Sequence, residues 1–400
     1  MGSYLREVQC AAKPAELAFC KLVASEQHFH DLDEVQSRQV DDPGLPGPEW
    51  LDQIRRGRPN LQDLRDGALP QVVGSPVSLY VLPSHQGGWK SDGGLQRGTA
   101  VRGGDTTDLD PDHPRPFGSH LRTIGTALAG VAITALAGAQ LVRTADERQA
   151  VAAWVALARR AGQQPTRFDP AMVAGLPEPA QRYLRHAITP GTPLRTVAVI
   201  EMAGRFGLGD KNDHRFWPMR ARQILAPPFG FVWIPHIGSG LMRMSGSDGL
   251  VGHEAWTRFW LLGTVPLVRA AGTPDLARSA VGRTIGEALW VPASLMPANG
   301  ISWEPVGTDS ARAVFEVRGE RHAIELTVND HGRPLSIVLQ RWSSANPEGI
   351  FRWQPFGATI EAVGTFSGYT VPTRLSGGNH FGTADYFPFF QAEVLSIEHL

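Results

Sequence analysis

The chain has 400 residues, enough for two ordinary domains, and a formal net charge of −1 at pH 7. This charge balance gives no electrostatic reason to bind nucleic acid, whose phosphates attract clustered positive charge. Both cysteines, Cys10 and Cys20, lie near the start of the chain, so the remainder can form no disulfide or cysteine-based zinc framework.

Residues 1–121 show no sustained hydrophobic periodicity, and clusters of Pro, Gly, Asp and Ser recur along them. Such a segment buries too little apolar surface to offset the entropy of ordering it. We predict either a disordered extension or an over-extended gene start, and the sequence leaves both interpretations open. Because no methionine lies between Met1 and Met172, a shorter natural chain would need an alternative start codon.

An apolar run from Thr123 to Val142 contains no charged side chain and is closed by Arg122 and Arg143. As a helix rising about 1.5 Å per residue it would be about 30 Å long, which matches the hydrocarbon core of a bilayer. We predict a transmembrane helix over residues 122–143 and a single-pass membrane protein. A cleaved signal peptide and a buried soluble helix are the alternatives. The membrane side of the C-terminal part stays open, with the arginines after the run mildly favouring the cytoplasm.

Two further helices are predicted in residues 144–193, which we interpret as a helical connector. Residues 148–161 (RQAVAAWVALARRA) have the apolar spacing of an amphipathic helix that continues from the apolar run. Residues 176–187 (LPEPAQRYLRHA) open with prolines, which suit the first turn of a helix.

From residue 194 onward, apolar and polar residues alternate in the manner of half-buried strands. Residues 329–332 (NDHG) predict a hairpin turn between two such runs. One helix interrupts the series, from Pro274 to Leu289, with Thr273 as its candidate N-cap. A sheet of so many strands is too long to stay flat. We therefore predict an α+β fold for residues 194–400, in which a large antiparallel sheet curls like a half-barrel around one or two helices.

Eight segments are spread over about residues 170–400, and their order and spacing are informative. They are LPEPAQRYLRHAI from Leu176, FWPMRARQ from Phe216, FGFVWIPHI from Phe229, RMSGSDGLVGHEAWTRFWLLGTVPLV from Arg243, RSAVGRTIGEALWVPASLMP from Arg278, RPLSIVLQRW from Arg333, PFGATIEAVGTFSGYTVPTRL from Pro355 and HFGTADYFPFF from His380. Together they resemble a family of uncharacterised bacterial proteins, a domain of unknown function usually preceded by a membrane segment. The resemblance implies a membrane-associated bacterial protein, and it transfers no catalytic residue.

The predicted helix carries the best candidate for a binding site. Arg283 and Glu287 are four residues apart and Trp290 is three further, so all three project from one helix face. Arg220 and Asp248 lie in predicted strands and are candidates to join them in a polar anchor for the head group of an amphiphilic ligand. The alternative, which such pairs serve more often, is a structural Arg–Glu pair that holds the helix to the sheet. In both cases we expect the pair to be buried.

The histidines and serines give no signature of a metal site or a catalytic nucleophile. His253 and Glu254 are adjacent, but the second histidine of a zinc-binding H-E-x-x-H motif is missing. His322 and Glu325 lie in a predicted strand, where an offset of three places them on opposite faces. No serine lies in a G-x-S-x-G sequence between a strand and a helix. We predict no metal, no cofactor and no catalytic residue.

Aromatic side chains are abundant, with eleven tryptophans and seventeen phenylalanines. Rings on strands fill a core or line an apolar pocket, and the sequence does not separate the two. Our leading hypothesis is a membrane-anchored protein, attached through residues 123–142, that binds a lipid, acyl chain or other apolar ligand inside the curled sheet. Its architecture is similar to that of half-barrel carriers of bacterial lipoproteins, which is weak support for a function. The alternatives are an enzyme that uses Arg283, Glu287 and Asp248, and an envelope scaffold.

Overall fold

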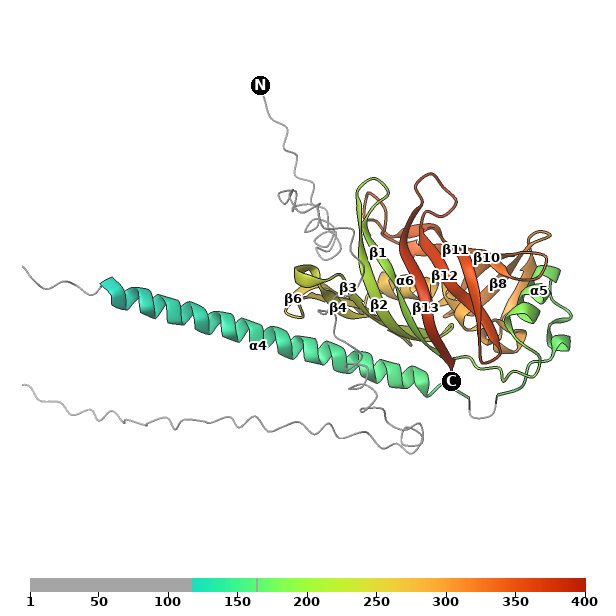
Figure 1. The fold of residues 1–400 in the computed structure, drawn as a ribbon, viewed down its shortest axis with the longest axis horizontal. Helices are drawn as coiled ribbons and strands as arrows, with labels where there is room; N and C mark the ends of the chain where they lie inside the picture. The colour runs from blue at the N-terminus through green and yellow to red at the C-terminus, as the bar shows by residue number, and fades with distance from the viewer. Residues whose placement is uncertain (1–116, 163–164) are drawn as a thin grey trace, which may run out of the picture. The chain divides into compact units, whose positions relative to one another are not determined.

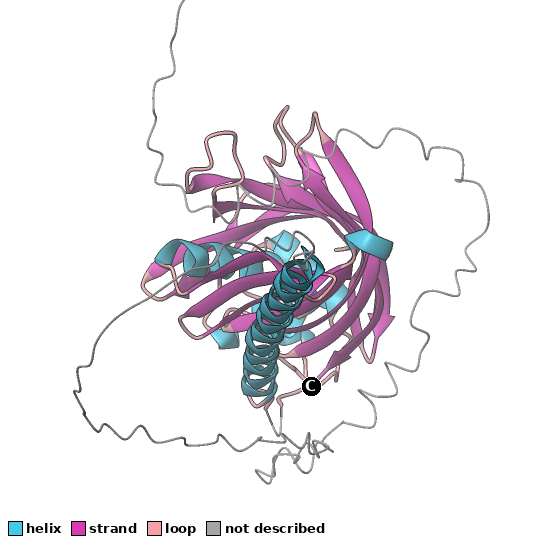
Figure 2. Cartoon of the chain, turned by 90° about the vertical axis from the view of Figure 1, so that its left-hand side faces the viewer, coloured by secondary structure: helices cyan, strands magenta, loops and turns pink. Residues whose placement is uncertain are grey.

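The computed structural model of the chain describes residues 117–162 and 165–400. Within these residues, thirteen strands form one sheet in the order β6-β5-β4-β3-β2-β1-β13-β12-β11-β10-β9-β8-β7. The sheet bends into a half-barrel with a helix, α6, inside its curve, as Figure 1 and Figure 2 show. The strands are β1 (Ala198–Gly209), β2 (His214–Ala226), β3 (Gly230–Ile237), β4 (Met244–Val251), β5 (Glu254–Leu261), β6 (Val265–Ala271), β7 (Ser302–Pro305), β8 (Ser310–Val317), β9 (Glu320–Val328), β10 (Pro334–Ser343), β11 (Arg352–Phe366), β12 (Tyr369–Asn379) and β13 (Phe387–His399).

The sheet consists of two antiparallel meanders that meet at its centre. Strands β1 to β6 follow one another in chain order to one edge, and β7 to β13 run from the opposite edge back to the middle. There β1 pairs with β13, so that Ala198 lies opposite His399. The segment between β6 and β7 crosses the concave side from one edge to the other. The prediction of a large, curled antiparallel sheet is confirmed.

The helix α6 (Pro274–Gly286) begins as the sequence predicts. The Thr273 side chain accepts a hydrogen bond from the backbone N–H of Leu276, which satisfies a donor that the first helical turn leaves free. The helix ends three residues before the predicted Leu289 and continues in short 3-10 turns, η3 (Ala288–Trp290), η4 (Pro292–Leu295) and η5 (Pro297–Asn299). Ala280, Ile285 and Leu289 are buried in the core.

The alternation of buried and partly exposed residues along the strands explains why the main core lies on the concave side. In β9, His322, Ile324, Leu326 and Val328 are buried while the residues between them are partly exposed. The inward side chains of both meanders pack against α6, the 3-10 turns and α5 (Glu178–Ala187) in one cluster. The predicted hairpin turn joins β9 to β10: the Asn329 side chain accepts from the backbone N–H groups of His331 and Arg333.

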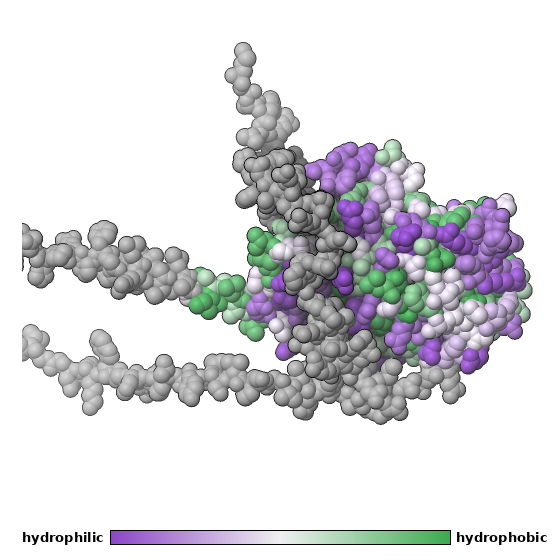
Figure 3. Space-filling model, in the orientation of Figure 1, coloured by the Kyte–Doolittle hydropathy of each residue, from purple (hydrophilic) through white to green (hydrophobic). Residues whose placement is uncertain are grey.

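The apolar run and the amphipathic segment after it form one helix, α4 (Phe117–Ala158). Its C-terminal part packs on the convex side of the sheet, where Ala150, Ala153 and Leu157 join a second cluster with Val232 and Trp256. Several apolar side chains earlier in α4 are exposed, and this stretch is coloured hydrophobic in Figure 3. They include Val131, Ile133, Leu136 and Leu141.

The transmembrane prediction is not supported. Among the residues that the structure describes, no helix is both long enough and apolar enough to cross a membrane. Side chains of residues 123–129 lie outside the described set, as does most of the predicted extension over residues 1–121.

Candidate functional site

Five side chains form a row across the concave face of strands β2 to β6. Cross-strand pairing places Gln223 opposite Trp233, Trp233 opposite Asp248, Asp248 opposite Thr257, and Thr257 opposite Ala270. Directly opposed residues of antiparallel strands project to the same face. We call these five residues the inner row. Three of them are polar, in a concavity that is otherwise mostly apolar.

Helix α6 lies over the inner row and places Arg283 between two carboxylates. Arg283 Nη1 donates to Asp248 Oδ2 at 2.5 Å, and Arg283 Nε donates to Glu287 Oε1 at 2.8 Å. The guanidinium also stacks on aromatic rings, 4.4 Å from the centre of Phe231 and 4.8 Å from that of Trp233. Only 15 % of the Arg283 side chain is exposed. The predicted Arg283–Glu287 pair is therefore present and largely buried.

The remaining carboxylate oxygens of this cluster also have partners. Gln223 Nε2 donates to Glu287 Oε2, and the Thr257 hydroxyl donates to Asp248 Oδ1 at 2.8 Å. Burial disfavours the charge of Arg283, but the fields of Glu287 and Asp248 outweigh burial and raise its pKa. The cluster is thus a closed ionic network, with two carboxylates sharing one guanidinium.

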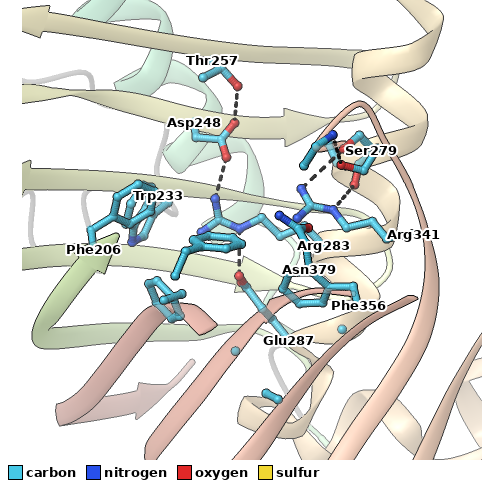
Figure 4. Close-up of a pocket in the computed structure, with 18 of the residues that line it drawn as sticks. Phe206, Trp233, Asp248, Thr257, Ser279, Arg283, Glu287, Arg341, Phe356 and Asn379 are labelled. Atoms are coloured by element: carbon cyan, nitrogen blue, oxygen red, sulfur yellow. Dashed lines mark hydrogen bonds and ion pairs between the residues drawn. The ribbon is translucent and has the colours of Figure 1, made fainter. Parts of the chain in front are cut away.

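Beside this cluster the concave side of the sheet holds a partly open cavity of about 450 Å³ with a mostly apolar wall (Figure 4). The volume lies within the range of about 300 to 1,000 Å³ that is usual for small-molecule sites. Its apolar lining includes Phe206, Trp233, Phe259, Leu276, Ile337, Phe356, Ile360, Leu375, Phe389 and Phe390.

A second arginine lies on the cavity wall away from the inner row. Arg341, on β10, donates to the backbone oxygen and to the hydroxyl of Ser279 at 3.4 Å each. Its guanidinium lies over the ring of Phe356, 5.1 Å from the ring centre. Figure 4 shows Arg341, Ser279, Asn379 and Phe356 on the opposite side of Arg283 from Trp233.

Four of the five predicted site residues line the cavity: Asp248, Arg283, Glu287 and Trp290. Trp290 does not join the ionic network, because its Nε1 donates to the backbone oxygen of Pro372 at 3.0 Å. Arg220 is exposed and is not part of the site. It lies three residues before Gln223 on the same strand, and an odd offset in a strand reverses the face.

The sequence analysis missed Gln223, Thr257 and Arg341 as polar residues of the cavity. A signal for Gln223 existed. Ala221, Gln223 and Leu225 are two residues apart, so an inward Leu225 implies an inward Gln223 and outward arginines. Arg341 had no such signal, because its place depends on the curl of the whole sheet.

These features define an α+β protein whose curled antiparallel sheet holds an apolar cavity with an ionic network on its wall. The chain belongs to a family of unknown function, DUF6544, whose pattern covers residues 166–392. The family resemblance of the sequence is thereby confirmed. No curated protein matches the chain.

The solved structures that match the chain show weak similarity, as two of them illustrate. A LolA superfamily protein from Nitrosomonas europaea has 8% identity and a TM-score of 0.30, over 55% of this chain and 91% of its own. A DUF1329 family protein from Desulfovibrio piger has a TM-score of 0.23 and 9% identity, over 58% of this chain and 94% of its own. At these scores the similarities carry no conclusion about this chain.

Proposed function

We propose that the protein binds an apolar or amphiphilic ligand, such as a lipid or an acyl chain, inside the half-barrel. The observation that carries this proposal is the apolar cavity of about 450 Å³ between the sheet and α6. Protein interiors are normally packed with few voids larger than a water molecule. Each methylene group that moves from water into such a cavity contributes about 0.8 kcal/mol.

The wall of the cavity suits a ligand that is mainly apolar and has a small polar part. Aromatic and aliphatic side chains form most of it, and a few polar groups are gathered at the Arg283 network and at Arg341. Binding sites for small molecules commonly combine an apolar wall with a few placed polar groups that fix orientation.

The first experiment asks what the full-length protein carries. We expect native mass spectrometry of the purified chain to show bound mass, and an organic extract to contain a compound with a long apolar part. If the chain is purified empty, binding of N-phenyl-1-naphthylamine, a fluorescent apolar probe, measures access to the cavity.

A pair of adjacent variants makes this test specific. Ala270 lines the cavity, whereas Ala271 on the same strand is exposed and is not in its wall. We expect Ala270→Phe to fill part of the cavity and weaken probe binding at least about tenfold, which corresponds to ~1.4 kcal/mol. Ala271→Phe should bind like the unchanged protein. Equal binding by both variants would place the probe elsewhere and refute the proposal.

The two alternative functions lack a comparable observation. An enzyme acting through Asp248 or Glu287 needs a carboxylate that is available to substrate, but Arg283, Gln223 and Thr257 occupy the carboxylate oxygens of both residues. A scaffold that only presents a surface needs no interior cavity. We therefore retain ligand binding as the proposed function.

Attachment to a membrane through residues 123–142 is a separate proposal. It is supported by the exposed apolar side chains of α4, among them Ile133 and Leu141. The measurement is fractionation of cells that produce the full chain, followed by extraction with alkaline carbonate. Retention in the membrane pellet supports an integral anchor, and complete release by carbonate contradicts it.

A further inference from the structure

Arg341 brings a positive charge to the inner face of the sheet. Ile337 and Ser343 of the same strand, β10, are buried and line the cavity. Arg341 is an even number of residues from both, so its side chain projects to the same face, and it also lines the cavity. Moving a charged group from water toward an apolar interior is costly. An inward arginine at this position therefore calls for a physical explanation.

Helix α6 leaves room for the Arg341 side chain and helps to fix it. A Cβ atom on Gly282 would come within 3.2 Å of Arg341 Cγ, so a larger residue there would crowd the arginine. The two hydrogen bonds from Arg341 to Ser279 end on uncharged oxygens and are long, at 3.4 Å each. The ring of Phe356 lies under the guanidinium. These contacts hold the cation in place without neutralising its charge.

The charges of the cavity wall differ from place to place. Asp248 and Glu287 share Arg283, so this network has a formal excess of one negative charge, and its carboxylate oxygens already accept hydrogen bonds. Among the described residues that line the cavity, Arg341 is the only charged one outside the network. In a weakly screened interior an anion is repelled by the network and attracted by Arg341.

The polar residues near Arg341 lie at one end of the cavity. Ser343 and Asn379 line the cavity and are the last residues of β10 and β12. In the pairing of β11 with β12, Asn379 lies opposite Phe356, and further along these strands Leu375 lies opposite Ile360. The wall therefore changes from polar to apolar along the strands, which suits a molecule with a polar head and an apolar chain.

We propose that the ligand is an amphiphile whose anionic head group, a carboxylate or a phosphate, pairs with Arg341 while its chain lies along the apolar wall. The planar guanidinium, with five N–H donors, suits the two oxygens of either group. This inference rests on the proposed function, because it requires a ligand in the cavity. It adds the charge of the head group and the residue that selects it.

The test uses three probes with a twelve-carbon chain on the full-length protein at pH 8: dodecanol, dodecanoate and dodecyl phosphate. Each competes with N-phenyl-1-naphthylamine for the cavity. In Arg341→Gln we expect competition by both anions to weaken at least about tenfold, the effect of losing one charge-assisted hydrogen bond. Dodecanol should compete with this variant as it does with the unchanged protein, which shows that the cavity is intact. The anion that competes more strongly with the unchanged protein identifies the head group as carboxylate or phosphate.

Two further variants assign the effect to the charge at this position. Arg341→Lys keeps a positive charge, so it should weaken anion binding less than Arg341→Gln does. Arg220→Gln also removes one positive charge, but Arg220 is exposed and does not line the cavity, so anion binding should not change. Equal weakening in Arg220→Gln and Arg341→Gln would attribute the effect to the overall charge of the protein and overturn the inference.

The remaining outcomes separate this inference from the proposed function. If Arg341→Gln weakens all three probes alike, Arg341 only supports the cavity wall, and the inference fails while ligand binding stands. The same holds if the anions bind this variant as tightly as the unchanged protein. If no probe competes and the purified chain carries no ligand, both fail.

Discussion

At the residue scale, the pairing of Arg283 with two carboxylates leads to a prediction about stability. Glu287→Ala removes one counter-charge from Arg283, which is 15 % exposed, and leaves Gln223 Nε2 without its acceptor. Removing one partner of a buried pair typically costs about 3 to 5 kcal/mol. Because Asp248 still pairs with Arg283, we expect a loss of about 2 to 4 kcal/mol in the free energy of unfolding, measured by urea denaturation.

The control for this prediction is Glu325→Ala. Glu325 accepts from Arg312 Nη2 at 3.1 Å, but both side chains are more than a third exposed. Exposed pairs contribute about 0 to 1 kcal/mol, so this variant should stay within that range. If the two variants lose equal stability, the network around Arg283 does not behave as a buried one.

The same residues illustrate what local spacing can and cannot predict. The offset of four between Arg283 and Glu287 was sufficient to predict their pairing on one helix face. The offset of three between Arg220 and Gln223 likewise indicates that they lie on opposite faces of the strand. The prediction nevertheless selected the charged, outward residue Arg220 and not Gln223. The alignment of Trp233 with Asp248 depends on the register of two strands, which no single stretch of sequence contains.

At the scale of elements, Asp146 attaches α4 to the convex side of the sheet. Its side chain lies between Arg269, which donates through Nε at 3.0 Å and Nη2 at 2.7 Å, and Arg258, whose Nη1 is 3.3 Å away. Asp146 is 5 % exposed and Arg258 is 7 % exposed. Asp146→Ala would leave the buried Arg258 without its nearest counter-charge. We expect faster amide hydrogen exchange over residues 146–158 of α4.

The neighbouring residue provides the control. Glu147 is exposed and pairs with Arg143 along the same helix. Glu147→Ala also removes one negative charge, but from the solvent side, so the exchange of α4 should change little. Equal acceleration in both variants would mean that net charge, rather than the Asp146 contacts, determines how firmly α4 is held.

At the scale of the whole molecule, a buried histidine makes stability depend on pH. His399 stacks on Tyr369 at 4.0 Å, and burial lowers its pKa from 6.5 to about 4. The unfolded chain therefore takes up a proton at a higher pH than the folded one. Stability from this group is complete above about pH 6.5 and is lost as the pH falls toward 4, by about 3 kcal/mol at most.

Urea denaturation between pH 7 and pH 4 measures this dependence. His399→Phe keeps an aromatic ring for stacking and removes the titrating group, so its stability should fall less steeply with decreasing pH. Some slope should remain, because burial also lowers the pKa values of His186, His236 and His322. Identical slopes in the two proteins would rule out His399 as a contributor.

Much of the fold follows from patterns that are local in the chain. Alternation predicts the strands, and Thr273 predicts the start of α6. The order of the strands could not be predicted, because the pairing of β1 with β13 joins residues almost 200 positions apart. The cavity could not be predicted either, since the same aromatic residues would serve a filled core. Only the way in which α6 packs against both meanders decides between a cavity and a filled core.

The central pairing of β1 with β13 has a consequence for how the chain folds. Each meander is built from neighbouring hairpins, which close short loops, whereas the seam between them must close a very long one. We expect two cooperative units, residues 198–271 and 302–399, to gain protection first and the seam to form last. Pulse-labelled hydrogen exchange during refolding would reveal this order as late protection of the β1 and β13 amides that face each other. Earlier protection at the seam would show instead that folding starts from the centre of the sheet.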